Sequence, residues 1–279
     1  MLKLKTAAIQ MVSCSDESEN LKAAKRLLAE AKAAGADIAV LPENFLNYGQ
    51  KKKPGQAEQK TFIQNMSDIA RAQKLWLVAG SYPMTLQGLA NVFDVPSGLN
   101  SDKPFATSLV FDDSGQVFFH YKKVHLFDAQ VGDQVKTYRE SDEYAHGANV
   151  ETFDSPWGRL GIAICYDVRF PEMFIRLAQQ GAKVIFVPSA FTEVTGRAHW
   201  EVLLRARAIE SQCYIVAANQ GGDHDVGRAT WGQSMVVSPW GEVMSELARG
   251  EGVLVECLDL EALDDIRRNM PIQQHRRLF

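Results

Sequence analysis

The chain has 279 residues, of which 46% are hydrophobic and 23% charged, and its formal net charge at neutral pH is −4. These values are ordinary for a globular protein and exclude a strongly basic surface of the kind that binds nucleic acid or anionic membranes. No apolar segment approaches the roughly 20 residues needed to span a bilayer. We therefore expect no nucleic-acid partner and no membrane insertion.

The N-terminal segment and the cysteines predict a cytoplasmic protein. Residues 1–20 lack the long apolar core of a signal peptide and become acidic early. Cys14, Cys165, Cys213 and Cys257 are scattered and show no CxxC spacing, which argues against a disulfide framework or a structural zinc site. Since an unpaired cysteine is usually a small buried apolar residue, we expect Cys14, Cys213 and Cys257 in the core.

The first predicted elements are a helix and a buried strand. LKAAKRLLAEAKA (21–33) has helical periodicity, and AGADIAVLPENF (34–45) follows with a glycine stop and a continuous apolar run. This order is typical of a crossover helix that leads to a strand buried on both faces.

The same order of elements returns in the second half of the chain. The matched pairs are 34–45 with 180–191, 69–82 with 206–220, and 108–117 with 234–243. No linker rich in proline and serine divides the chain. We therefore expect one domain over residues 1–279, built from two similar halves.

Each half combines crossover helices with hairpin strands, which predicts mixed sheets and argues against an eight-stranded barrel. Two such sheets packed face to face, with helices outside, would form an α/β fold of four layers, an α-β-β-α sandwich. Residues 125–150 are the least regular segment, and we expect a long polar loop there with a functional role.

Reactive side chains follow three of the predicted strands. They are Glu43 after IAVLP, Lys122 and Lys123 after VFFHY, and Cys165 after GIAI. In open α/β sheets, ligands bind beyond the carboxyl ends of the strands. Taken alone, Glu43 is compatible with a surface position and Cys165 with the last core position of its strand. Their occurrence at three strand ends favours a shared site.

Several common enzyme classes have no motif in this sequence. The sequence contains no HExxH or HxxxH motif, which argues against a metal site. It also lacks GxSxG, the phosphate-binding GxxxxGK[ST] loop and the dinucleotide-type GxGxxG, which mark other enzyme classes. A histidine partner for Cys165 is possible, but no spacing indicates one.

Three segments together resemble the signature blocks of the nitrilase superfamily of carbon–nitrogen hydrolases: LPENF around Glu43, YKKVHLFD around Lys123 and GIAICYDVRFPE around Cys165. Their order and spacing match along the whole chain, including PSAFTEVTG and AHWEVLLRARAIESQCYIVAANQ. The resemblance implies the α-β-β-α sandwich, usually assembled as a homodimer or higher homo-oligomer. It also implies that neither a metal ion nor an organic cofactor is required.

The resemblance implies a catalytic triad of Glu43, Lys123 and Cys165. A thiol with a pKa of about 8.5 is only a few per cent thiolate at neutral pH, so a cysteine nucleophile needs a base and a positive charge. Glu43 would be the general base, Lys123 would stabilise the thiolate and the oxyanion, and Cys165 would form a thioester. The backbone N–H of Tyr166 would be a second oxyanion donor. Glu140, in YRESDEY, matches a further carboxylate that orients the lysine and the substrate; the alternative is an exposed loop acid.

One position departs from the family pattern. His146-Gly147 stands where Pro-Gly is usual, which leaves the conformation of this turn open.

Within the superfamily, CYDVRFPE and the downstream segments most resemble the Nit-type amidases, especially the deaminated glutathione amidase branch. These hydrolyse a small amide that carries a carboxylate. The planar guanidinium of Arg169 could hold that carboxylate with two hydrogen bonds; alternatively, Arg169 pairs with Asp167 or Glu172. By analogy between the halves, Phe191 and Thr195 would face the same pocket.

Two other functions remain open from the sequence. One is a nitrilase or ureido-acid hydrolase that uses the same triad, and the other is a non-catalytic binding protein that keeps the fold. The presence of Glu43, Lys123 and Cys165 together argues against the second.

Overall fold

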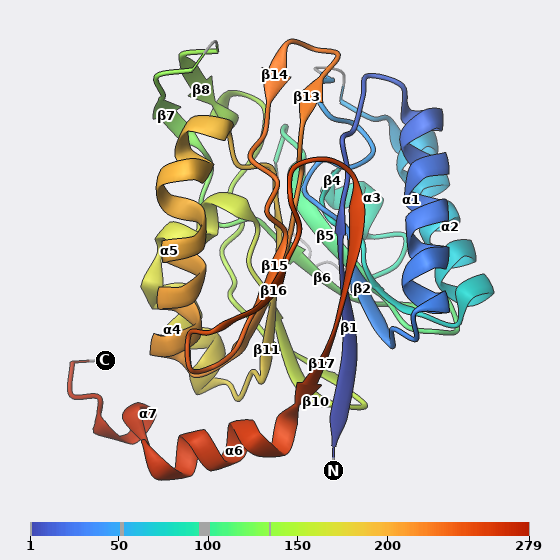
Figure 1. The fold of residues 1–279 in the computed structure, drawn as a ribbon. Helices are drawn as coiled ribbons and strands as arrows, with labels where there is room; N and C mark the ends of the chain where they lie inside the picture. Colours follow the sequence, from blue (N-terminus) through green and yellow to red (C-terminus); the bar gives the residue numbers. More distant parts are fainter. Residues whose placement is uncertain (1, 51–52, 95–100, 134, 279) are drawn as a thin grey trace.

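The computed structural model describes residues 2–50, 53–94, 101–133 and 135–278. They form two large mixed sheets that face each other between two layers of helices (Figure 1). Helices α1 (Glu17–Ala33) and α2 (Gln56–Gln73) cover the first sheet, and helices α4 (Pro171–Gln179) and α5 (Glu193–Ser211) cover the second. The predicted four-layer α-β-β-α sandwich is confirmed.

The first sheet contains strands from both ends of the chain. Its strands are β1 (Lys3–Gln10), β2 (Ile38–Val40), β3 (Trp76–Val78), β4 (Tyr82–Met84), β5 (Phe105–Phe111), β6 (Val117–Lys122) and β17 (Gly252–Asp259). The order is β17-β1-β2-β3-β5-β4, with β6 paired to β5. Strands β1, β2 and β3 are parallel, whereas β17 runs antiparallel to β1 along its whole length.

The second sheet is built in the same way. Its strands are β9 (Phe153–Ser155), β10 (Gly158–Ile162), β11 (Val184–Ser189), β12 (Tyr214–Asn219), β15 (Met235–Val237) and β16 (Val243–Glu246). The order is β16-β15-β12-β11-β10-β9, and β10, β11 and β12 are parallel. Each predicted block of the first half therefore has its counterpart: α1-β2 and α4-β11, α2-β3 and α5-β12, β5-β6 and β15-β16.

Alternation along the central strands divides the hydrophobic core into two layers. On β2, Ile38 and Val40 face the second sheet, while Ala39 and the following Leu41 face α1 and α2. All four side chains are fully buried. A strand apolar on both faces is what a position between a helix layer and a second sheet requires.

Helix α1 shows how the sequence sets the limits of an element. Asp16 caps its first turn, because its carboxylate accepts hydrogen bonds from the backbone N–H groups of Ser18 and Glu19. Just beyond its end, Gly35 has a φ of +88°, a left-handed conformation that glycine adopts with little strain.

Two predictions need correction. The segment 125–150 is not a plain loop: it contains a small hairpin, β7 (Asp128–Gln130) and β8 (Thr137–Arg139), and a short 3₁₀ helix, η1 (Glu140–Asp142). Cys213 is buried as expected, but Cys257 is exposed and Cys14 partly exposed. Cys257 lies on the edge strand β17, on the face opposite to that of the buried Leu254 and Leu258.

The remaining elements are short or peripheral. They are α3 (Leu86–Leu89), the hairpin of β13 (Asp223–His224) and β14 (Arg228–Ala229), α6 (Leu260–Asn269) and α7 (Ile272–His275). Within the described part of the chain, every helix is too short or too polar to cross a membrane.

Candidate active site

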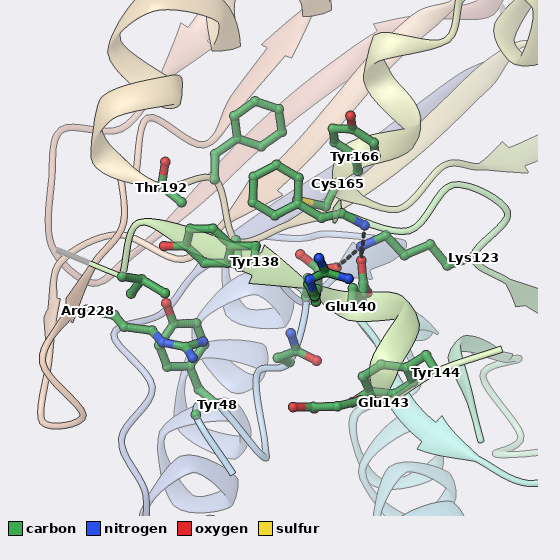
Figure 2. Close-up of a pocket in the computed structure, with 18 of the residues that line it drawn as sticks. Tyr48, Lys123, Tyr138, Glu140, Glu143, Tyr144, Cys165, Tyr166, Thr192 and Arg228 are labelled. Carbon is green, nitrogen blue, oxygen red and sulfur yellow. Dashed lines mark hydrogen bonds and ion pairs between the residues drawn. The ribbon is translucent and has the colours of Figure 1, made fainter. Parts of the chain in front are cut away.

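The three reactive residues predicted from the sequence meet in one cavity of about 460 Å³. Glu43 follows β2, Lys123 follows β6, and Cys165 begins the 3₁₀ helix η2 (Cys165–Arg169) after β10. Figure 2 shows Lys123 reaching toward Glu140, with Cys165 beside them at the end of its loop. Three segments that lie far apart in the sequence thus place their side chains in one cavity.

Lys123 is the centre of a buried ionic cluster. Its Nζ atom lies 2.8 Å from Glu43 Oε1 and 2.9 and 2.8 Å from the two carboxylate oxygens of Glu140. Lys123 is 1% exposed and Glu43 4% exposed. A buried ammonium needs such partners, since removing a lone charge from water costs several kcal/mol. Glu140 also accepts a hydrogen bond from the backbone N–H of Phe127 at 2.6 Å, which fixes its carboxylate on the β7 side of the cavity.

The charges of this cluster set the protonation of its members. Burial acts to lower the pKa of Lys123, but the negative charges of Glu140 and Glu43 outweigh it and hold that pKa well above its ordinary value. Burial raises the pKa of Glu140, and Lys123 only partly offsets this effect. The ammonium is therefore a permanent positive charge at neutral pH.

Cys165 occupies a strained position beside this cluster. Its φ of +47° lies in the left-handed region, which a side chain other than that of glycine, asparagine or aspartate rarely adopts. Burial raises the pKa of the Cys165 thiol well above its ordinary value, the charge of Glu43 raises it further, and Lys123 lowers it. The thiol is thus protonated at rest, next to a carboxylate that can accept its proton.

The backbone around Lys123 depends on Gly147. The N–H of Lys123 donates to Ala106 O at 2.9 Å, and the N–H of Gly147 donates to Lys123 O at 2.7 Å. A Cβ atom on Gly147 would lie 2.2 Å from the carbonyl oxygen of Lys122. The glycine of the His146-Gly147 pair therefore lets this turn pack directly on the lysine strand.

A buried aspartate that the sequence did not indicate connects the cysteine loop to the lysine strand. Asp167 is fully buried. Its carboxylate accepts hydrogen bonds from Ile164 N (2.8 Å), Tyr121 Oη (2.8 Å) and His125 N (3.0 Å), and lies 2.7 Å from His125 Nδ1. Tyr121 and His125 flank Lys123 in the chain. Asp167 thus fixes the cysteine relative to the lysine.

The four predicted substrate-binding residues, Tyr166, Arg169, Phe191 and Thr195, all line the cavity. The Arg169 guanidinium lies 5.6 Å from the ring centre of Tyr166 and 5.3 Å from that of Phe191. Its Nη1 atom is 3.2 Å from His199 Nδ1. Within the described residues Arg169 forms no ion pair with Asp167 or Glu172, so the alternative role of holding the loop by such a pair is wrong.

Other cavity residues had no signal in the sequence. Tyr48, Tyr138, Glu143 and Arg228 line the cavity on the side away from Cys165 (Figure 2). They come from a turn after β2, from β8 and its neighbourhood, and from the β13-β14 hairpin. These short polar segments lack the periodicity that would have placed them.

No group of three or more histidine, cysteine, aspartate or glutamate side chains with metal-binding geometry occurs among the described residues. The cluster of two carboxylates and one ammonium beside a thiol is suited to acyl transfer through a covalent cysteine adduct.

Comparison with known proteins agrees with this chemistry. The sequence profile of the carbon–nitrogen hydrolase family matches residues 5–268. A curated relative from Yersinia enterocolitica, named deaminated glutathione amidase, is 37% identical over 99% of this chain and 94% of its own. The crystal structure of the Caenorhabditis elegans NitFhit protein superposes with a TM-score of 0.83 at 35% identity; the match covers 99% of this chain and 65% of NitFhit. A mutant amidase from Nesterenkonia sp. AN1, in which acrylamide has added to the active-site cysteine, superposes with a TM-score of 0.77 at 25% identity, covering 97% of this chain and 99% of that one.

Proposed function

Because the chain belongs to the carbon–nitrogen hydrolase family, we propose that it is an amidase in which Glu43, Lys123 and Cys165 form the catalytic triad. The observation that carries the proposal is the Lys123 ammonium, buried between Glu43 and Glu140 and close enough to Cys165 to lower the pKa of its thiol. A structural ion pair has no need of a strained cysteine at its side.

Acylation is the first half of the reaction. The Cys165 thiol transfers its proton to Glu43 as sulfur attacks the amide carbonyl carbon, and the oxyanion forms against the Lys123 ammonium and the backbone N–H of Tyr166. When this intermediate collapses, the carbon–nitrogen bond breaks. The departing nitrogen takes the proton from Glu43 and leaves as ammonia or an amine, so that a thioester remains on Cys165.

Hydrolysis of the thioester completes the cycle. Glu43 accepts a proton from water as the oxygen attacks the thioester carbonyl, and the second oxyanion is stabilised by the same two donors. The carbon–sulfur bond then breaks, the carboxylic acid leaves, and the proton held by Glu43 returns to the sulfur. Glu140 contacts Lys123 alone among the three triad members and acts through it, as a positioning residue.

The substrate is proposed to be a small amide that carries a carboxylate, such as deaminated glutathione or the ω-amide of a 2-oxo acid. Arg169, which has no carboxylate partner of its own in the described chain, would bind that carboxylate, with Phe191 and Thr195 forming the adjacent wall. The names of relatives such as the Yersinia enterocolitica protein support the same substrate class.

The test is ammonia or amine release from a panel of deaminated glutathione, α-ketoglutaramate, a nitrile and a ureido acid, combined with intact-mass detection of a thioester on Cys165. The wild-type protein should prefer the two carboxylate-bearing amides. Cys165→Ala should remain folded and inactive, whereas Cys257→Ser, which changes an exposed cysteine, should retain activity. Full activity in Cys165→Ala would refute the mechanism, and a tenfold preference for the nitrile or the ureido acid would refute the substrate class.

We also propose that residues 1–279 act as one domain in a homodimer. Exposed apolar side chains on α5 (Val194, Val202 and Ile209), together with Trp240, support an interface on this side of the molecule. Light scattering coupled to size exclusion should give twice the mass of the chain; a monomer at micromolar concentration would contradict it.

A cytoplasmic location is proposed as well. It is supported by the four cysteines, all of which are free. Fractionation of the source cells should recover the protein in the cytosolic fraction.

A further inference from the structure

A second cavity, of about 270 Å³, lies beside the catalytic one and has no role in the proposed reaction. It is lined by Lys122, whereas the next residue in the chain, Lys123, lines the catalytic cavity. We infer that the second cavity is a binding site for a small carboxylate with an apolar body, held by an ion pair to Lys122. The inference goes beyond the proposed function and does not depend on the amidase reaction.

The described residues that line the two cavities form separate sets, although both sets take members from one segment of the chain. Glu140, Glu143 and Tyr144, all labelled in Figure 2, line the catalytic cavity. The residues that follow directly, 145–148, line the second cavity. A ligand in the second cavity would thus lie against the continuation of the segment that carries Glu140, outside the space that an amide occupies at Cys165.

Hydrogen bonds hold the backbone of this lining in place. The N–H of Ala145 donates to Pro104 O at 2.9 Å, and the N–H of Gly147 donates to Lys123 O at 2.7 Å. Ala145 also forms an isolated β-bridge with Phe105, another lining residue. A site whose backbone is already ordered loses little conformational entropy when a ligand binds.

Lys122 has hydrogen-bond donors that no protein group uses. Within the described residues its Nζ atom forms no hydrogen bond and no ion pair, and it lies 4.8 Å from the centre of the Phe105 ring. An ammonium has three N–H donors, so contact with one ring face leaves donors for a ligand. The other polar side chains of the described lining, His146 and Ser101, each have a ring nitrogen or a hydroxyl within hydrogen-bond distance of a backbone carbonyl.

The electrostatic surroundings of Lys122 favour an anion. None of the lining residues that the structure describes is acidic. Burial lowers the pKa of Lys122 from its ordinary value, and the charge of Glu151 only partly offsets this effect. A ligand carboxylate at ion-pair distance would stabilise the ammonium form that burial destabilises.

The rest of the lining is mainly apolar and determines the body of the ligand. Leu86, Phe105, Ala145 and Ala148 contribute hydrocarbon side chains. Since a water molecule occupies about 30 Å³ in the liquid, a cavity of about 270 Å³ holds a ligand of roughly eight non-hydrogen atoms. A short branched carboxylate such as 4-methylpentanoate has this size and combines one charge with an apolar chain.

The experiment uses 4-methylpentanoate as the probe and reads the methyl NMR spectrum of protein labelled with ¹³C in its alanine methyl groups. Ala145 and Ala148 report on the second cavity, and Ala190 reports on the catalytic cavity. We expect the signals of Ala145 and Ala148 to shift with one dissociation constant, on the order of 1 mM for so small a ligand. The neutral analogue 4-methylpentan-1-ol should bind there at least about tenfold more weakly.

Two substitutions of Lys122 separate its charge from its bulk. Lys122→Met should weaken the binding seen at Ala145 and Ala148 at least about tenfold, because a charged hydrogen bond is lost. Lys122→Arg keeps the charge and should retain binding, and any response of Ala190 should be the same in both variants as in wild type. Lys25→Met, which removes an exposed lysine of α1, is the matched control and should change none of the responses.

Shifts confined to Ala190 would place the carboxylate in the catalytic cavity alone and would overturn the inference, as would a spectrum that does not respond to the probe. Undiminished shifts of Ala145 and Ala148 in Lys122→Met would overturn it as well, since apolar contact would then explain the binding. Loss of binding in both Lys122→Met and Lys122→Arg would assign Lys122 a structural role and overturn it too. None of these measurements involves amide hydrolysis, so each of these results leaves the proposed function standing.

Discussion

The backbone N–H of Glu43 donates a hydrogen bond to the carbonyl oxygen of Ser189 at 3.3 Å. The two residues hold equivalent positions in the two halves of the chain, each directly after the proline that follows a buried apolar run. Gln220 adds a second link, since its Nε2 atom donates to the Glu43 carbonyl oxygen at 3.2 Å. The proposed general base is therefore positioned by the opposite half, and its counterpart there contributes backbone instead of a carboxylate.

Replacing Glu43 with glutamine should change thiol acidity and amide hydrolysis in opposite directions. Burial is the main cause of the raised pKa of Cys165, and the charge of Glu43 raises it further. Without that charge the thiol pKa falls, so the pH profile of iodoacetamide alkylation should shift to lower pH. Amide hydrolysis should fall by about a hundredfold or more because the general base is lost.

Glu30→Gln, on the exposed face of α1, is the control for Glu43→Gln and should change neither profile. An alkylation profile that moves to higher pH in Glu43→Gln would contradict the electrostatic account of the site.

Asp167→Asn should disturb the site from outside the cavity. Asparagine retains one acceptor oxygen and turns an NH₂ group toward donors, so at least one of the groups now bound by Asp167 loses its partner. We expect a loss of about 2–4 kcal/mol in the free energy of unfolding and slower alkylation of Cys165. Thermal unfolding and alkylation at fixed pH measure the two effects.

Tyr121→Phe is the graded comparison, because it removes one hydrogen bond to Asp167 and the one that Tyr121 Oη accepts from the backbone N–H of Val124, and it should cost about 1–2 kcal/mol. Wild-type alkylation kinetics in Asp167→Asn would mean that this aspartate stabilises the fold without positioning the cysteine.

Gly147→Ala should displace the lysine strand. The added Cβ atom would lie 2.2 Å from the Lys122 carbonyl oxygen, a contact with backbone that a rotamer change cannot relieve. We expect a lower melting temperature and a loss of amidase activity that exceeds the loss of folded protein, since Lys123 is next in the chain. Gly132→Ala is the matched control, because nothing lies within 4 Å of its Cβ position. Equal behaviour of the two variants would refute the steric argument.

His120 should make the protein lose stability on acidification. Burial, with a smaller contribution from Lys122, lowers the pKa of His120 from 6.5 to about 4. Between these two values the unfolded chain binds a proton that the folded protein does not, so the free energy of unfolding falls as the pH decreases through this range.

His120→Phe should remove this part of the pH dependence, on the order of 1 kcal/mol between about pH 7 and about pH 5 because the ring is partly solvated. The new ring can still pack on Phe93, whose centroid lies 4.3 Å from that of His120. Urea unfolding at both pH values measures the effect, and His275→Phe, on the exposed C-terminal segment, is the control. An unchanged slope in His120→Phe would assign the acid sensitivity to other groups.

The sequence predicts the layers of this fold well because they depend on local patterns. Glycine stops and apolar runs recur in both halves, and each produces a buried strand next to a helix, as in 34–45 and 180–191. Glu43, Lys123 and Cys165 could be found because each follows a predicted strand, and the topology of the sheets brings these strand ends together.

The parts that were missed depend on contacts between distant segments. Asp167 is positioned by Tyr121, 46 residues earlier, and no local pattern distinguishes it from a surface acid. Each strand of the β7-β8 hairpin is only three residues long and contains no buried residue, so its alternation is too short to predict a strand. Cys257 lies on the face of β17 opposite to the buried Leu254 and Leu258, and the composition of β17 does not reveal that this face is left exposed there.

The pairing of β1 with β17, from Lys3 opposite Asp259 to Gln10 opposite Gly252, has a consequence for biosynthesis. While the polypeptide is still growing on the ribosome, β1 has no neighbour on that side, and its unpaired backbone groups form an open edge of the kind that aggregates. The first sheet can be completed only after Gly252–Asp259 has been translated, more than two hundred residues after β1. We therefore expect the need for chaperones during synthesis to be set by the time that passes before β17 is translated. Formation of the catalytic cavity should matter less.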